Sequence, residues 1–254
     1  MAVIIDVNTY IGNLPYWQLR HNDADGLVSR MDIAGIERAF VSPIRGYLTS
    51  DRDGNAEALA ACAKHPGRLW PALTFNPYPN GLEYKEQLDA PGPKLVKLLP
   101  QHQNFVLSEE PGLAAMADYC GEKGIPVMLV NRMWTTQRIG AASLPAYKAF
   151  IAQHPGTQFI VACVNYLFEM QSTLDILRNC PNAWVETSGM MGLGELEIFV
   201  REVGAGRILH GSCMVLQMPP EVGPLRVRSA RISDEDKERI LSGNAIRLFR
   251  LNDE

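Results

Sequence analysis

Nucleophilic and ionisable side chains occur where short apolar segments of this chain end. Cys163 and Cys213 closely follow two such segments, His210 is the last residue of one of them, and Lys97 lies inside a third. A cysteine becomes a nucleophile when a cationic neighbour lowers the pKa of its thiol. Two thiolates and a histidine can instead bind a soft metal ion. The simpler interpretation is that the two cysteines are small apolar core residues, since a free cysteine behaves mainly as one, and the sequence leaves these three interpretations open.

Other polar residues near segment ends are suited to hold a substrate. A lysine that points into a core needs a carboxylate partner, and Glu186 is the candidate for Lys97. The planar guanidinium groups of Arg132 and Arg45 suit a carboxylate, although solvated surface arginines would look the same in the sequence. Tyr10 would serve as a general acid only if its pKa of ~10 were lowered.

The elements that must position these residues repeat one pattern. A helical segment leads through a short turn containing Gly or Pro into a brief, continuously apolar strand. Gly ends helices because it adopts positive φ, and Pro cannot continue them. After an opening strand that begins at Val3, the predicted strands are 39–41, 69–73, 95–98, 126–130, 158–162, 183–186 and 207–210.

Eight short apolar strands alternating with helices in 254 residues predict an α/β fold, a single (β/α)8 barrel over residues 1–254. The stretch 232–251, which begins with Ser233 and three acids, predicts an additional C-terminal helix. A doubly wound open sheet is the alternative, but no Gly-rich phosphate turn follows the first strand. The carboxyl ends of the strands are where a barrel of this kind places its active site.

Composition excludes several classes of function. The net charge is −4 with no basic block, which argues against a nucleic-acid partner. No apolar run approaches the ~20 residues of a membrane span, and the start of the chain does not resemble a secretory signal. The five cysteines are scattered and odd in number, which predicts reduced thiols and a cytoplasmic protein.

Several motifs resemble those of the amidohydrolase-related family of TIM-barrel, metal-dependent hydrolases. The resemblance covers nearly the whole chain and implies a hydrolase or lyase acting on a small carboxylate or lactone. The members of that family also form dimers or larger assemblies, so the resemblance implies a homo-oligomer. The motifs are residues 6–12, 65–68, 96–100, 124–127, 207–213, 232–235 and 240–249.

The same resemblance implies a metal centre whose ligands this chain lacks. The two first-strand histidines of the family fall on Asn8 and Tyr10, and the fifth-strand histidine falls on Val130. The sixth-strand histidine and the eighth-strand aspartate fall on Cys163 and Cys213. Zinc needs three or four His, Cys or carboxylate ligands, so we expect no metal and no other cofactor.

Three functions therefore stay open: a metal-independent hydrolase or lyase, an inactive barrel that binds a metabolite or a protein, and a hydrolase whose metal site is rebuilt from Cys163, Cys213 and His210. In each enzyme hypothesis the ligand is a small, anionic molecule. The aromatic residues Trp17, Tyr47 and Trp134 either form a wall of the pocket or cover the barrel mouth. The predicted catalytic residues are Tyr10, Cys163, His210 and Cys213, and the predicted substrate-binding residues are Asn8, Lys97, Asn131, Arg132 and Glu186.

Overall fold

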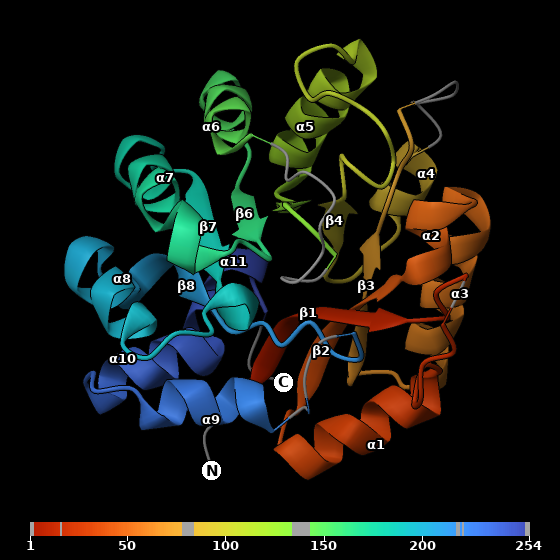
Figure 1. Ribbon diagram of the computed structural model, residues 1–254. Helices are drawn as coiled ribbons and strands as arrows, with labels where there is room; N and C mark the ends of the chain where they lie inside the picture. Colours follow the sequence, from red (N-terminus) through yellow and green to blue (C-terminus); the bar gives the residue numbers. More distant parts are fainter. Residues whose placement is uncertain are drawn as a thin grey trace.

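The computed structural model describes residues 3–15, 17–77, 84–133, 143–216, 219 and 221–251. Its eight strands form one sheet in which each strand pairs in parallel with the next along the chain (Figure 1). The strands are β1 (Ile5–Ile11), β2 (Arg38–Pro43), β3 (Leu69–Leu73), β4 (Leu95–Leu98), β5 (Val127–Val130), β6 (Phe159–Ala162), β7 (Ala183–Glu186) and β8 (Ile208–Leu209).

Backbone hydrogen bonds join the first strand to the last. Val7 N donates to His210 O (3.0 Å), and Cys213 N donates to Asn8 O (2.8 Å). The sheet therefore curls round to bring β8 beside β1, as in a (β/α)8 barrel. The predicted fold is confirmed, and the doubly wound open sheet is excluded.

Helices alternate with the strands and surround the barrel (Figure 1). Capping residues set where several of them begin and end. Asp23 and Ser50 accept hydrogen bonds from backbone N–H groups of the first turn, and Gly35 and Gly124 end helices with φ of 70° and 67°. The helices are α1 (Ala24–Ala34), α2 (Ile44–Leu48), α3 (Asp51–Lys64), α4 (Tyr84–Asp89), α5 (Pro111–Lys123), α6 (Leu144–Gln153), α7 (Tyr166–Asn179), α8 (Glu195–Val203), α9 (Val222–Ser229), α10 (Asp234–Glu238) and α11 (Asn244–Phe249).

The C-terminal helix is present but interrupted. Ser233 caps it by accepting from Asp236 N (3.1 Å), as the sequence predicts. A π-helical turn at Arg239–Gly243 then separates α10 from α11. The wider turn bends the segment.

No described helix is long and apolar enough to cross a membrane.

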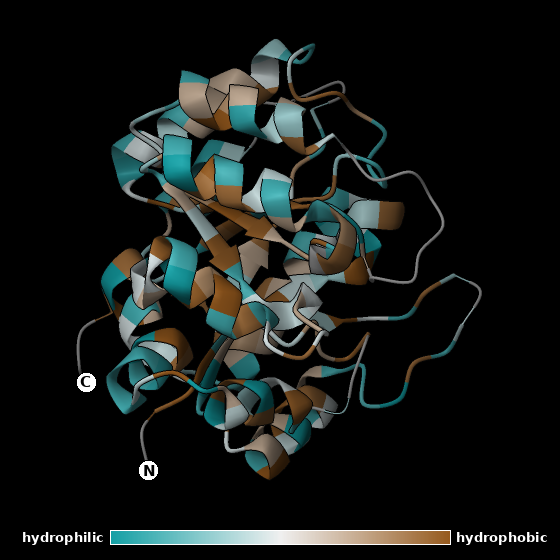
Figure 2. Cartoon of the chain, turned by 60° about the vertical axis from the view of Figure 1, so that its left-hand side comes forward, coloured by the Kyte–Doolittle hydropathy of each residue, from teal (hydrophilic) through white to brown (hydrophobic). Residues whose placement is uncertain are grey.

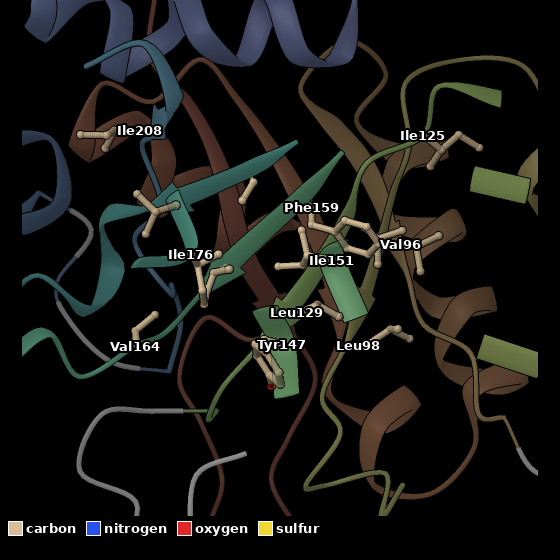
Figure 3. Close-up of a cluster of buried hydrophobic side chains, with 14 of the residues drawn as sticks. Val96, Leu98, Ile125, Leu129, Tyr147, Ile151, Phe159, Val164, Ile176 and Ile208 are labelled. Carbon is tan, nitrogen blue, oxygen red and sulfur yellow. The ribbon is translucent and has the colours of Figure 1, made fainter. Parts of the chain in front are cut away.

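The apolar strand residues divide into two layers. Ile5, Phe40 and Ile160 belong to a cluster that fills the barrel interior. Leu129 and Phe159 belong to a second cluster between the strands and the surrounding helices (Figure 3). Figure 2 shows the strands as a mostly hydrophobic centre enclosed by helices with hydrophilic outer faces. Both faces of the sheet are buried, which explains why its strands are continuously apolar.

The C-terminal segment closes the amino end of the barrel. The ring of Phe249 lies 4.1 Å from the ring of Phe40, centroid to centroid, and Leu248 and Leu251 join the interior cluster. Apolar side chains thus fill the interior from this end. The polar side chains of the interior lie near the carboxyl ends of the strands, where the site residues were expected.

Candidate functional site

A buried ammonium group lies at the carboxyl ends of the first strands. Lys97 of β4 donates from Nζ to Asn8 Oδ1 of β1 (2.6 Å) and to Ser42 Oγ of β2 (2.8 Å). Its Nζ also lies 3.4 Å from the centre of the Tyr10 ring, a cation–π contact. All four residues are fully buried. The structure thus brings together three of the predicted site residues around one positive charge.

Asn8 connects this charge to a buried carboxylate. Its Oδ1 accepts from Lys97, while its Nδ2 lies 3.3 Å from Glu186 Oε1 of β7. The pairing of β1 with β2 shifts register between Asp6 and Thr9, and an irregularity of this kind redirects the side chains next to it. The predicted partnership of Lys97 and Glu186 is therefore made through the Asn8 amide, at the position where the resemblance placed a metal-binding histidine.

Glu186 in turn organises the end of β6. It accepts from Cys163 N (2.8 Å) and from Ser188 Oγ (2.6 Å) through Oε1, and from Ser188 N (2.6 Å) through Oε2. Gly211 lies against this carboxylate so closely that a Cβ at that position would overlap Glu186 Oε2. The carboxylate fixes the backbone that carries Cys163 and thereby the direction of its thiol.

Cys163 and Cys213 are in contact. Their sulfur atoms lie 3.7 Å apart, and Cys163 Sγ also lies 3.3 Å from Asn8 Nδ2 and 3.4 Å from Ser188 Oγ. Both cysteines have φ in the left-handed region, 52° and 56°. Such backbone costs a non-glycine residue about 1 kcal/mol or more, and it recurs at functional sites.

The environment separates the acidities of the two thiols. The hydrogen bond from Cys213, helped by Ser188 and the positive charge of Lys97, lowers the pKa of Cys163. The same hydrogen bond, together with burial, raises the pKa of Cys213. Lys97 is the cationic neighbour that a nucleophilic cysteine requires. Of the two thiols, Cys163 is thus the one that ionises more readily.

Burial shifts the acid–base behaviour of the other two groups at the centre. Loss of water lowers the pKa of Lys97 to about 8, and the surrounding thiols and carboxylates oppose this shift. Burial raises the pKa of Tyr10 well above its ordinary value. A general acid near neutral pH needs the opposite shift, so Lys97 suits proton transfer better than Tyr10 does.

His210 lies apart from the thiols. It is fully buried beside Asp6, with Nε2 3.9 Å from Asp6 Oδ2, and a Cβ on Gly223 of α9 would touch its ring. Neither ring nitrogen has a hydrogen-bond partner among the described residues. Burial, with the charges of Arg226 and Arg228, lowers the pKa of His210 to about 3, so the ring is neutral.

Asp6 is a buried carboxyl that the sequence candidates did not include. Oδ1 accepts from Asn8 N (2.9 Å) and Ser212 N (3.1 Å), whereas Oδ2 has no described hydrogen-bond partner. Burial raises the pKa of Asp6 to about 7. In the unfolded chain this carboxyl ionises near pH 3.8. Its contribution to stability is therefore complete below that pH and is lost as the pH rises through about 7.

We expect Asp6→Asn to flatten this pH dependence. The amide Oδ1 keeps both backbone hydrogen bonds, and no charge has to be buried above pH 7. Urea unfolding at pH 5 and pH 8 measures the effect, since each unit of pKa shift corresponds to about 1.4 kcal/mol. The variant should gain more stability relative to the wild type at pH 8 than at pH 5. If the free energy of unfolding changes between pH 5 and pH 8 by the same amount in the variant as in the wild type, Asp6 does not titrate in this range.

Asn131 and Arg132 follow β5 and meet a carboxylate of α7. Arg132 Nη2 lies 2.5 Å from Glu169 Oε1, and Asn131 Nδ2 donates to both Glu169 oxygens (3.1 and 3.2 Å). Arg132 Nε is buried without a hydrogen-bond partner among the described residues. Glu169 was not among the sequence candidates, although it lies in the first turn of the helix that Asn165 caps. An acid near a helix start is too common to indicate this role.

The other arginine and the aromatic residues have mixed positions. Arg45 is half exposed and pairs with Asp53 (2.8 Å) and Glu57 (3.0 Å), so its role is that of a surface ion pair. Tyr47 is buried with its ring edge toward Tyr10, while Trp17 is 63% exposed. Trp134 lies outside the described residues. Of the two described members of the predicted aromatic wall, Tyr47 adjoins the polar centre and Trp17 does not.

The described residues of this centre do not provide a ligand set for a divalent metal. Within the described ranges, no group of three His, Cys, Asp or Glu side chains is placed to hold a metal ion. His210 thus does not complete a site with Cys163 and Cys213. The Lys97 ammonium bonds Asn8, the first of the positions from which the family's ligands would come, and it would repel a second cation there.

Comparisons with known proteins agree with the resemblance drawn from the motifs. The amidohydrolase family model matches residues 29–251. The fold resembles 2,6-dihydroxybenzoate decarboxylase from Rhizobium (18% identity, 99% of each chain covered, TM-score 0.73). It also resembles 5-carboxyvanillate decarboxylase from Sphingomonas paucimobilis (14% identity, 99% of this chain and 100% of that chain covered, TM-score 0.72). A third similar structure is that of a probable 2-pyrone-4,6-dicarboxylic acid hydrolase from Acinetobacter baumannii, which contains bound citric acid (13% identity, 98% of this chain and 99% of that chain covered, TM-score 0.71). A search of curated protein sequences finds no match.

Proposed function

Because this chain belongs to the amidohydrolase family, we propose that it is a hydrolase of a small carboxylated ester or lactone in which Lys97 takes the place of the metal cation. The observation that supports this most is the buried ammonium group of Lys97. It lies 2.6 Å from Asn8 Oδ1, and its positive charge helps to lower the pKa of the Cys163 thiol. A fixed positive charge in a site without water stabilises an oxyanion strongly.

In this proposal Cys163 is the nucleophile. Its thiolate forms a bond to the carbonyl carbon of the lactone, and the ring C–O bond breaks. The released alkoxide takes a proton from Lys97, whose pKa of about 8 suits that transfer. Water then adds to the thioester, returns a proton to Lys97, and releases the hydroxy acid and the Cys163 thiolate.

Arg132 is the proposed holder of the substrate carboxylate. Its pairing with Glu169 uses Nη2 and leaves the buried Nε without a described partner. A guanidinium group binds carboxylates through paired N–H groups, and the structural relatives named above act on carboxylated molecules or bind citric acid. The substrate class is therefore a small carboxylate.

A second candidate function is a barrel that binds a ligand without converting it. Lys97, Cys163 and Glu186 are all fully buried, and they satisfy one another in the same way that a structural polar core would. A substrate must displace some of these contacts to react. Binding of a carboxylate without turnover would favour this second function.

The test is turnover of a panel that contains 2-pyrone-4,6-dicarboxylate, 2,6-dihydroxybenzoate and 5-carboxyvanillate, each with a metal chelator present. Ring opening of the lactone that persists with chelator supports the proposal. Release of CO2 from the hydroxybenzoates would instead indicate a lyase. Lactone hydrolysis that requires added zinc or manganese would refute the role of Lys97.

The pH dependence of that turnover is a separate prediction. Lys97 must be protonated to stabilise the oxyanion and to supply the proton, and it is protonated below its pKa of about 8. We therefore expect kcat to fall as the pH rises through about 8. In Lys97→Arg, which stays charged, the remaining rate should not fall in this range. A rate that keeps increasing above pH 9 in the wild type would contradict the assigned role.

A further inference from the structure

A cavity of about 540 Å³ opens at the amino ends of β2 to β5, at the opposite end of the barrel from Cys163. The turns that precede β3, β4 and β5 contribute to it, and the end of α11 closes one side. We call it the basal cavity. Its lining residues are Arg38, Gly67, Trp70, Gly92, Pro93, Lys94, Lys123, Gly124, Ile125, Pro126, Phe249, Arg250 and Leu251.

The basal cavity concentrates positive charge in a protein whose net charge is −4. Arg38, Lys94, Lys123 and Arg250 line it, and no described lining residue is acidic. Two of these cations have exposed partners outside the lining: Glu37 lies 3.5 Å from Arg38, and Asp89 lies 2.7 Å from Lys123. Such exposed ion pairs hold their partners weakly. Among the described residues that line the cavity, positive charge is therefore in excess.

Lys94 is the most buried of the four cations. It is 8% exposed, and its ammonium donates to the carbonyl oxygens of Ala90 and Gly92, the latter at 3.1 Å. Burial lowers the pKa of Lys94, and the negative charge of Asp89, which also pairs with Lys123, partly opposes this shift. One carboxylate thus serves two ammonium groups, and the carbonyl oxygens that solvate Lys94 carry no full charge. An anion in the cavity would therefore be stabilised.

Arg250 is held over the cavity by unusual backbone. It follows α11 with φ 52° and ψ 43°, the left-handed conformation that most often belongs to glycine at a helix end. An arginine there costs about 1 kcal/mol relative to glycine. Its guanidinium lies against Gly124, where a Cβ would be 3.1 Å from Arg250 Cζ. The chain thus has an arginine at position 250, where the backbone favours glycine, and a glycine at position 124, where a side chain would crowd the Arg250 guanidinium.

Aromatic side chains form the apolar wall of the same cavity. Trp70 is partly exposed, with Arg38 Cζ 5.6 Å from its ring centre, and Phe249 lies beside it in the lining. Guanidinium and ammonium donors recognise phosphate oxygens, and an indole surface packs against an unsaturated or aromatic group. The lining thus matches a ligand that has both a phosphate group and an aromatic group.

We propose that the basal cavity binds a phosphate monoester that carries an aromatic group. Arg250 and Lys94 contact the phosphate, and Trp70 contacts the aromatic group. This site is separate from the proposed catalytic centre and does not depend on it, because the two lie at opposite ends of the strands. A ligand bound there would join β2, β4 and the C-terminal segment, and would stabilise the folded chain.

Calorimetric titration of the full-length protein with AMP tests the proposal, with inorganic phosphate and citrate as comparison ligands. We expect saturable 1:1 binding of AMP, weaker binding of phosphate, and a strong decrease with added salt. The absence of AMP binding would overturn the proposal. Citrate that binds more tightly than AMP would overturn the assignment to a phosphate.

Two variants and one control locate the site. Arg250→Gly removes the cation at a position where glycine is favourable, so the fold should be at least as stable while AMP affinity falls about tenfold. Lys94→Gln should weaken AMP binding similarly. Arg201→Gln removes one positive charge from a 69% exposed side chain of α8 outside the cavity, and should leave the affinity unchanged. Equal weakening in all three variants would indicate general charge attraction and overturn the site.

Discussion

Asn8→Ala should destabilise the protein by about 3 kcal/mol. The change removes the acceptor that lies 2.6 Å from Lys97 Nζ and the donor that lies 3.3 Å from Glu186 Oε1. A buried cation and a buried anion then lose the amide that joins them, and water does not reach either group. Urea unfolding monitored by circular dichroism gives the free energy of unfolding of both proteins.

Ser42→Ala is the matched control, because it removes only one hydrogen bond to Lys97. We expect it to cost about 1 kcal/mol. In the double variant Asn8→Ala, Lys97→Met the cation is gone as well, so part of the loss should be recovered and the two effects should not add. Additive effects, or a cost of Asn8→Ala no larger than that of Ser42→Ala, would show that Asn8 does not bridge the charges.

Cys163→Ser should lower the rate of lactone hydrolysis by about 10³-fold or more. Serine keeps the size of the side chain, but its hydroxyl does not ionise where the Cys163 thiol does. The contacts that lower the pKa of this thiol, above all the hydrogen bond from Cys213, then have no thiolate to stabilise. The kcat of the purified variant, with chelator present, measures the loss.

Cys213→Ser provides the comparison, because a serine hydroxyl can still donate a hydrogen bond to Cys163. We expect about a tenfold loss or less from this change. Both variants should unfold at urea concentrations close to that of the wild type. If Cys213→Ser loses the larger share of activity, the two thiols have the opposite roles.

The fold was predictable from the sequence because its signals are local and repeated. Each short apolar strand follows a Gly or Pro turn, as at Gly124 before β5, and the same unit recurs around the barrel. The interruption of the C-terminal helix was not predictable in this way. The π-helical turn that divides α10 from α11 depends on how the segment packs against the barrel.

The contents of the site were predictable only in part. Strand ends gave Asn8, Lys97, Cys163 and Cys213 as candidates, and the structure places them close together, because parallel strands deliver their last residues to one edge. Which side chains contact one another was not predictable from the strand ends. Asn8 lies where β1 shifts register, between Lys97 and Glu186, and no sequence pattern indicates that shift.

The contacts of His210 could not be predicted from the sequence either. Its distance from Cys213 in the sequence is short, but it lies beside Asp6 and the helical layer, while Cys213 lies beside Cys163. Which face of a strand end a residue takes is decided by how the strand leaves the sheet. Asp6 was missed as a candidate for this reason, because its side chain direction in β1 is not evident from the sequence.

The most direct test of the central claim, that Lys97 replaces the metal cation, is the metal content of the full-length protein. Elemental mass spectrometry is done after incubation with zinc and manganese and then dialysis. We predict far less than one metal ion per chain in the wild type, because the ammonium beside Asn8 repels a cation. One tightly held ion per chain, lost in Cys163→Ser, would contradict the claim and restore a metal-dependent centre.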